Sequence, residues 1–219
     1  MYAFIFDMDG VIIDSEPIHF EIDTKTMKHF GVEISNKELE KYVGMTNPEM
    51  WKLIKDDYNI TESINEIINY QLGSKIKILR ESNIEPIEGI KELIFQLKNE
   101  NISIAVASSS PRKFIQEVLI KFNLIDCFQY IVSGEEVAKG KPAPDIYIEA
   151  AKQLGVNTEH CIVIKDSRNG VLAAKNAGMK CIGYRNINSG NQNLSQADIV
   201  IKSIKEVDVT LLKKWEEKL

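Results

Sequence analysis

The stretch that decides the fold is Phe4-Ile5-Phe6-Asp7-Met8-Asp9-Gly10-Val11, close to the start of the chain. Its apolar run is typical of a buried parallel strand, and the run stops abruptly at two carboxylates. Because alternate residues of an extended chain point the same way, Asp7 and Asp9 can reach one cation or one substrate group. Gly10 permits a sharp turn directly after them. The plain structural alternative is a capped turn, since Asp and Gly are common where strands end.

Downstream of Gly89, apolar runs and amphipathic helical patterns alternate, which predicts a parallel sheet with crossover helices. We predict helices around 114–122 and 171–177, and a helix over 145–154 that Gly155 ends. The fold class is therefore α/β, a three-layer Rossmann-like parallel sheet core. The predicted strands after the first are residues 102–107, 130–132, 161–164, 180–183 and 199–201.

Strand signals vanish between Ser15 and about Ser82, where helical patterns take their place. Ser35-x-x-Glu38 is a capping box that predicts a short helix, and Asn47-Pro48 predicts the start of another at 49–58. Thr61 is expected to cap a third, longer helix. We predict a catalytic core of residues 1–14 and 83–219 with an inserted all-helical cap domain of residues 15–82. The two junctions would act as hinges that close the cap over the carboxylates.

Composition limits the function classes. With 219 residues and 44% hydrophobic content, the chain can bury a core. The net charge of −5, without a block of like charges, predicts no nucleic-acid partner. No apolar run approaches the roughly 20 residues that span a bilayer, so no membrane is expected. The three cysteines match no metal spacing, and we expect buried free thiols in a cytoplasmic enzyme with no obligatory protein partner evident.

Polar residues follow several predicted strands, at positions that the fold would bring together. Ser108 and Ser109, Lys141 and Asp166 join Asp7 and Asp9 in this group. Ligands of open α/β sheets bind beyond the carboxyl ends of the strands, so these residues are expected to converge. Phosphoryl transfer needs a nucleophile, a proton donor, a divalent cation and positive or N–H groups around the phosphate. The set supplies all four, whereas no serine has the glycine pattern of a nucleophile elbow.

The ordered motifs resemble the haloacid dehalogenase superfamily, in the branch with beta-phosphoglucomutase and small sugar-phosphate phosphatases. They cover almost the whole chain. The matching strings are Asp7-x-Asp9-Gly10-Val11, Asp14-Ser15-Glu16-Pro17, Lys141-Pro142-x-Pro144-Asp145 and Asp166-Ser167-x-x-Gly170.

The resemblance implies a role for each residue of the convergent set. Asp7 is the expected nucleophile that forms an aspartyl-phosphate, and Asp9 the general acid and then base. Mg²⁺ is the expected cofactor, with the Asp7 carboxylate, the Asp9 main-chain carbonyl and Asp166 as ligands. Ser108, Ser109 and Lys141 are expected to bind phosphate, the serines through a helix N-terminus.

Lys165 departs from the family pattern, because relatives often carry an acid beside the metal-binding aspartate. A lysine about 6 Å from Mg²⁺ would oppose the ion by roughly 5 kcal/mol at an effective dielectric of about 20, an upper bound. Lys165 therefore points to solvent, pairs with an acid, or weakens metal binding. An inactive phosphate-binding relative is the alternative that this residue leaves open.

The cap sequence bears on the choice between a phosphatase and a mutase. Mutases of this branch carry an arginine in a Gly-x-Ser-Arg string that grips a second phosphate, and this chain has Gly44-Met45-Thr46-Asn47 there. Asn47 offers no cationic fork, which favours a phosphatase of a small phosphorylated metabolite such as a sugar phosphate. A mutase of the beta-phosphoglucomutase type stays open, and a receiver domain is disfavoured by the helical insertion. The expected cap and substrate residues are His19, Gly44, Thr46, Asn47 and Trp51.

Overall fold

The structure is a computed structural model that describes residues 2–33, 38 and 47–210. It divides into two compact units. The larger unit holds residues 1–14 and 85–219, and the smaller unit holds residues 15–84. The sequence placed the second junction two residues earlier, between 82 and 83.

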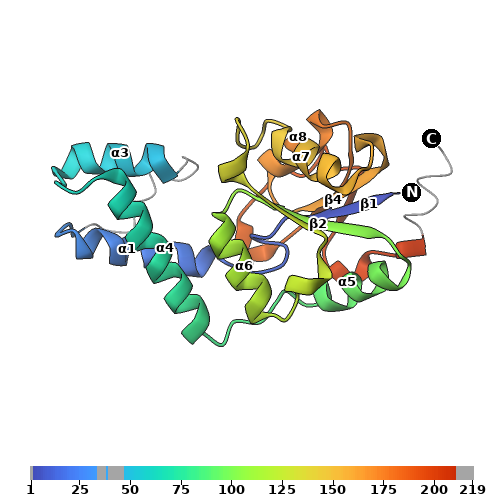
Figure 1. The fold of residues 1–219 in the computed structure, drawn as a ribbon, viewed down its shortest axis with the longest axis horizontal. Coiled ribbons are helices and arrows are strands. Elements are labelled where there is room, and N and C mark those ends of the chain that lie inside the picture. The colour runs from blue at the N-terminus through green and yellow to red at the C-terminus, as the bar shows by residue number, and fades with distance from the viewer. Residues whose placement is uncertain (1, 34–37, 39–46, 211–219) are drawn as a thin grey trace. The chain divides into compact units, whose positions relative to one another are not determined.

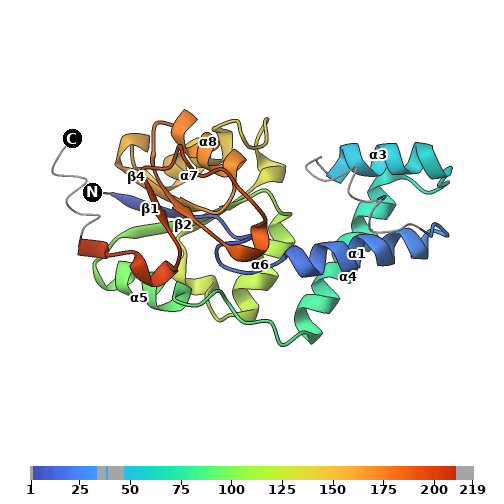
Figure 2. The ribbon, with the colours of Figure 1, turned by 180° about the vertical axis from the view of Figure 1, so that it is seen from behind.

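The larger unit is built on a parallel sheet (Figures 1 and 2). Within the described residues, six strands pair in the order β3-β2-β1-β4-β5-β6, and every neighbouring pair is parallel. This arrangement confirms the predicted α/β fold class. The strands are β1 (Ala3–Phe6), β2 (Ser103–Ser108), β3 (Tyr130–Ser133), β4 (Cys161–Lys165), β5 (Lys180–Tyr184) and β6 (Ile199–Ile201).

Helices cover both faces of the sheet, which makes three layers (Figure 1). On one face, α7 (Asp145–Leu154) and α8 (Arg168–Asn176) bury small and apolar side chains against alternate residues of the central strands. On the other face, α5 (Ile90–Asn99) packs on β2 and α6 (Arg112–Lys121) packs on β3. Gly155 ends α7 in the left-handed conformation, as its sequence position predicts. Short 3₁₀ turns lie at Ile125–Cys127, Gly134–Glu136, Thr158–His160, Ile187–Ser189 and Ile204–Glu206.

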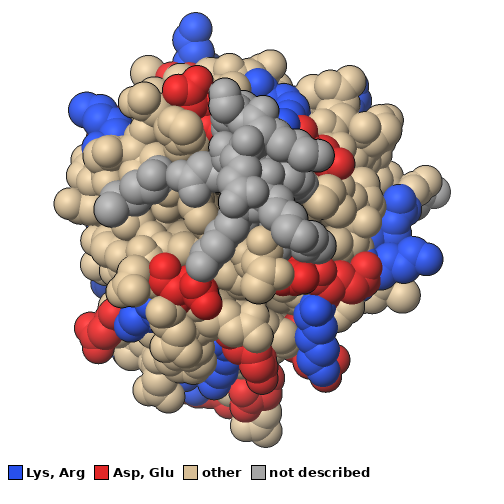
Figure 3. Space-filling view, turned by 90° about the vertical axis from the view of Figure 1, so that its right-hand side faces the viewer, with Lys and Arg blue, Asp and Glu red and all other residues tan. Residues whose placement is uncertain are grey.

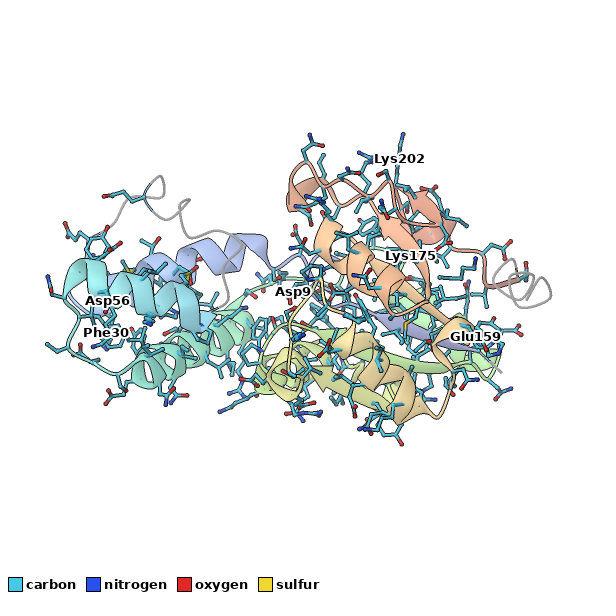
Figure 4. All side chains as sticks on the ribbon, turned by 90° about the horizontal axis from the view of Figure 1, so that it is seen from above. Asp9, Phe30, Asp56, Glu159, Lys175 and Lys202 are labelled. Carbon is cyan, nitrogen blue, oxygen red and sulfur yellow. The ribbon has the colours of Figure 1, made fainter. Side chains whose placement is uncertain are left out.

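The register of the sheet brings the carboxyl ends of β1, β2 and β4 to the same edge. Phe6, the last residue of β1, is paired with Val106 of β2 on one side and with Ile164 of β4 on the other. The residues that follow these three therefore lie side by side at one edge of the sheet. Figure 4 shows Asp9 at this end of the larger unit and Glu159, which precedes β4, at the opposite end.

The smaller unit is helical in its described residues and consists of α1 (Glu16–His29), α3 (Asn47–Tyr58) and α4 (Ile64–Glu81). Met27, Trp51, Ile54 and Ile67 belong to its own apolar core. The cap of α4 is Ser63, not Thr61 as the sequence suggested. Ser63 and Glu66 form a reciprocal capping box, in which the Glu66 backbone N–H donates to the Ser63 hydroxyl and the Ser63 backbone N–H donates to the Glu66 carboxylate. Thr61 lies too far upstream of the helix to make these hydrogen bonds. The short helix predicted from Ser35 lies outside the described residues.

The distribution of surface charges agrees with the composition. Acidic and basic side chains are interspersed on the face of the larger unit seen in Figure 3, with described atoms of both signs close together. Among the described helices, none has the length and apolarity that crossing a membrane requires. The three cysteines are free and buried, as predicted.

Candidate active site

Asp7 follows β1 and is almost completely buried, with 2% of its surface exposed. Its Oδ1 accepts two hydrogen bonds, one from the backbone N–H of Met8 at 2.9 Å and one from Lys141 Nζ at 3.1 Å. Its Oδ2 forms an ion pair with the Lys165 ammonium. One carboxylate is therefore held between two buried lysines, which lowers the repulsion that an incoming phosphate dianion would meet.

Asp9 is oriented by hydroxyl groups from the end of β2. Its Oδ2 accepts hydrogen bonds from Ser108 Oγ at 3.1 Å and from Ser110 Oγ at 2.8 Å. Ser108 Oγ also accepts from Ser110 N, at 3.0 Å. Ser108 thus holds the predicted acid–base residue as well as lying before α6. Ser110 is a site residue that sequence reasoning missed, although the string Ser108-Ser109-Ser110-Pro111 contained the signal.

Lys141 reaches the site from the loop that precedes α7. Besides Asp7, its ammonium donates to Ala107 O at 3.2 Å and lies 4.9 Å from the centre of the Tyr147 ring. Burial lowers the pKa of the Lys141 ammonium from its ordinary value, although the Asp7 carboxylate opposes this shift. Tyr147 is fully buried, and burial raises the pKa of its phenol well above the usual range. No sequence pattern had singled out Tyr147.

Lys165, the last residue of β4, points into the site. Its ammonium lies 2.8 Å from Asp166 Oδ1 and 3.5 Å from the Asp9 main-chain oxygen, in addition to its ion pair with Asp7. Burial disfavours the charged form, but the two carboxylates outweigh this penalty and raise the pKa of Lys165. Of the alternatives that the sequence left for this residue, the structure has the one in which it pairs with acids.

The loop after β5 supports the acidic end of the site. Ser189 Oγ donates a hydrogen bond to Asp166 Oδ2, and Asn186 Nδ2 donates to Gly10 O at 3.0 Å. Gly10 has a φ of +73°, and a Cβ there would overlap the Asp166 carboxylate. Glycine is therefore required both by the turn and by the close approach of Asp166. Sequence reasoning missed Ser189 and Asn186, whose loop carries no distinctive pattern.

The other predicted site residues lie apart from this cluster or outside the described part of the chain. Ser109 is exposed between the two serines that bind Asp9. Trp51 is fully buried in the apolar core of the smaller unit, which does not favour a role in lining a substrate pocket. Gly44, Thr46 and the side chains of His19 and Asn47 lie outside the described part, and their roles stay predictions.

The predicted metal ligands face an ammonium group instead of open space. The Asp7 carboxylate, the Asp9 carbonyl and the Asp166 carboxylate all contact Lys165 Nζ. Within the described residues, no group of three or more Asp, Glu, His or Cys side chains is arranged to hold a metal ion. The donor atoms suit Mg²⁺, but with Lys165 in this position the site does not fit the ion.

Comparison with known proteins places this chain in a family. The model of the family haloacid dehalogenase-like hydrolase matches residues 4–184. The chain belongs to that family. The superfamily and the hydrolase class predicted from the ordered motifs are thus confirmed.

Relatives with assigned activities align over most of the chain. Hexitol phosphatase B of Escherichia coli K12 is 32% identical over 184 residues, covering 82% of each protein. Beta-phosphoglucomutase of Bacillus subtilis is 32% identical and covers 99% of this chain and 96% of the relative. The bifunctional riboflavin kinase/FMN phosphatase of Arabidopsis thaliana is 33% identical over 96% of this chain. The chain spans only 55% of the length of that plant protein.

A solved structure supports the fold over almost the full length. CbbY from Rhodobacter sphaeroides, in complex with phosphate, superimposes with a TM-score of 0.86 at 25% identity. The match covers 97% of this chain and 100% of CbbY. The family fold with its helical cap is therefore that of this chain.

Proposed function

We propose that the chain is a phosphatase of a small phosphorylated metabolite, a sugar phosphate, and that it acts through an aspartyl-phosphate. The observation that carries the proposal is the buried Asp7 carboxylate between Lys141 and Lys165, with Asp9 held beside it by two serines. The family and the two sugar-phosphate relatives support the substrate class.

The proposed reaction has two steps that use the same residues. An oxygen of the Asp7 carboxylate attacks phosphorus, the ester P–O bond breaks, and the proton of the Asp9 carboxyl passes to the departing sugar oxygen. Water then attacks phosphorus, gives its proton to the Asp9 carboxylate, and the P–O bond to Asp7 breaks. Inorganic phosphate leaves, and both carboxyl groups return to their starting states.

The phosphate would be held by cations and donors already at this sheet edge. Lys141 neutralises negative charge shared between Asp7 and the phosphate, and Ser108 lies at the end of β2 before α6. The cytoplasmic location predicted from the sequence stays a prediction, and so does the Mg²⁺ dependence, which the position of Lys165 disfavours. Mg²⁺ takes no part in the proposed steps, because Lys165 occupies the position between its predicted ligands.

A phosphosugar mutase is the second candidate, favoured by the beta-phosphoglucomutase relative. The sequence feature against it is Asn47, which replaces the cationic residue that would hold a second phosphate. For the same reason, Asn47→Arg alone is not expected to create an efficient mutase, since a whole pocket is needed.

One assay separates the two candidates. Purified protein is incubated with a panel of sugar phosphates, including glucose 1-phosphate and glucose 6-phosphate, with EDTA and separately with added Mg²⁺. Release of inorganic phosphate and conversion between isomers are measured on the same samples. We expect phosphate release to be faster. Faster isomer conversion would identify a mutase, and neither activity on any sugar phosphate would contradict both candidates.

A further inference from the structure

The aspartate cluster has a cation of its own. Asp7 Oδ2 and Asp166 Oδ1 are both buried. The group that faces both is the Lys165 ammonium, which also contacts the Asp9 carbonyl oxygen. Buried carboxylates need a positive charge nearby, and here a side chain of the same protein provides it.

The path of the Lys165 side chain is fixed by its surroundings. Only 9% of the side chain is exposed, and its aliphatic part runs over Gly170 of α8. A Cβ at position 170 would overlap Lys165 Cγ and Cε. The stem is thus enclosed between β4 and α8, and the ammonium is delivered to the cluster rather than to solvent.

We propose that the Lys165 ammonium is the resident cation of this cluster, and that it holds the space between Asp7, Asp9 and Asp166 against divalent cations. Divalent cations would then bind weakly, and phosphoryl transfer would not require them. The part about phosphoryl transfer rests on the proposed function. The part about cation binding does not, because it concerns only the side chains of the cluster.

The charges at the cluster support this inference. The two carboxylates of Asp7 and Asp166 match the two ammonium groups of Lys141 and Lys165 in number. A glutamate in place of Lys165 would change the local charge by two units, which is the charge of one divalent cation. The lysine therefore supplies electrostatically what a bound divalent ion would otherwise add beside the nucleophile.

Binding of Mn²⁺, followed by the electron paramagnetic resonance of the free ion, tests the cation-binding part without any substrate. The parent is expected to bind Mn²⁺ weakly. Lys165→Glu should bind it about tenfold more tightly or better, since a repulsion becomes an attraction. Lys98→Glu, at an exposed position of α5, makes the same change in total charge and is expected to bind as weakly as the parent.

A second variant guards against a folding defect. Lys165→Met keeps most of the aliphatic stem over Gly170 but removes the ammonium, and it should also bind Mn²⁺ more tightly than the parent. Tight Mn²⁺ binding by the parent would overturn the inference. So would a failure of both folded Lys165 variants to bind more tightly than Lys98→Glu.

The catalytic part is tested by phosphate release in EDTA. The parent is expected to keep its activity in EDTA, whereas Lys165→Met should lose most of it there. Parent activity that requires added Mg²⁺ would overturn this part of the inference. If the parent hydrolyses no sugar phosphate, the proposed function fails, and the Mn²⁺ measurement still decides whether Lys165 excludes divalent ions.

Discussion

The side chain of Lys165 lies directly over the Cα of Gly170, so a Cβ on any larger residue at position 170 would overlap the lysine side chain. Gly170 is a helical residue of α8, two positions after the helix begins. Glycine is a weaker helix former than alanine, so its presence in α8 needs a reason in the packing. The reason is the enclosed stem of Lys165, which carries its ammonium to the carboxylates of Asp7 and Asp166.

We therefore predict that Gly170→Ala destabilises the protein. A Cβ would overlap the Lys165 stem, and forced overpacking typically costs about 1–3 kcal/mol. The helix-propensity gain of at most roughly 1 kcal/mol does not offset a cost in the upper part of that range. The measurement is the free energy of unfolding in urea.

Gly73→Ala is the matched control for this change. Gly73 lies in α4, is exposed, and has no atom close to the position of a Cβ. The same substitution there is expected to raise the free energy of unfolding by about 0.5–1 kcal/mol. Equal stabilisation by the two substitutions would show that Lys165 does not need the space at Gly170.

Asp7→Asn is predicted to abolish phosphate release while the chain stays folded. The amide has nearly the same shape but lacks the charged oxygen that attacks phosphorus. Removing one carboxylate beside two buried lysines lowers stability, so circular dichroism must accompany the assay. Asp126→Asn, at an exposed position, removes the same charge and should retain the parent rate. If Asp7→Asn released phosphate at a rate within about tenfold of the parent, Asp7 would not be the nucleophile.

Ser110→Ala is predicted to lower kcat by roughly tenfold, because a hydrogen bond to the Asp9 carboxyl group is lost. KM should change little, since this hydroxyl faces Asp9 and acts as a positioning group. Ser110→Thr restores a hydroxyl and should recover part of the rate. Steady-state kinetics of both variants test the role. A loss confined to KM would instead indicate that Ser110 binds substrate.

Two buried thiols should make the fold sensitive to alkaline pH. Burial raises the pKa of Cys161 to about 12, and burial with the nearby Asp198 raises the pKa of Cys181 to about 12. Both thiols stay protonated in the folded state, whereas in the unfolded chain they lose protons near their ordinary pKa. The stability that they contribute is complete below that ordinary pKa and is lost as pH rises toward 12.

The measurement is urea unfolding at about pH 8 and at about pH 10. Between these two pH values, each thiol should lower the free energy of unfolding by at most about 1.4 kcal/mol. A protein with Cys161→Ala and Cys181→Ala together should lose less stability over that interval than the parent. Comparing each protein with itself at the two pH values removes the packing effect of alanine. An identical loss in both proteins would mean that these thiols do not titrate on unfolding.

The sequence by itself determined the elements of the core and the polar residues that gather at one edge of its sheet. Apolar runs predicted the strands, because parallel strands covered on both faces are apolar throughout. Asp7 and Asp9 were recognisable because a buried strand that stops at two carboxylates is unusual without a function. Parallel strands end at one edge of a sheet, so even the meeting of these residues with Ser108 followed from the topology.

Only the tertiary structure decided the direction of Lys165 and the partners of the two aspartates. A lysine at the end of a strand can turn toward solvent or into the site, and the pattern along β4 does not distinguish them. The choice depends on the space over Gly170 and on carboxylates that are distant in sequence. Ser189 likewise reaches Asp166 from a loop without a recognisable motif. Such contacts depend on the packing of separate elements, which no local pattern encodes.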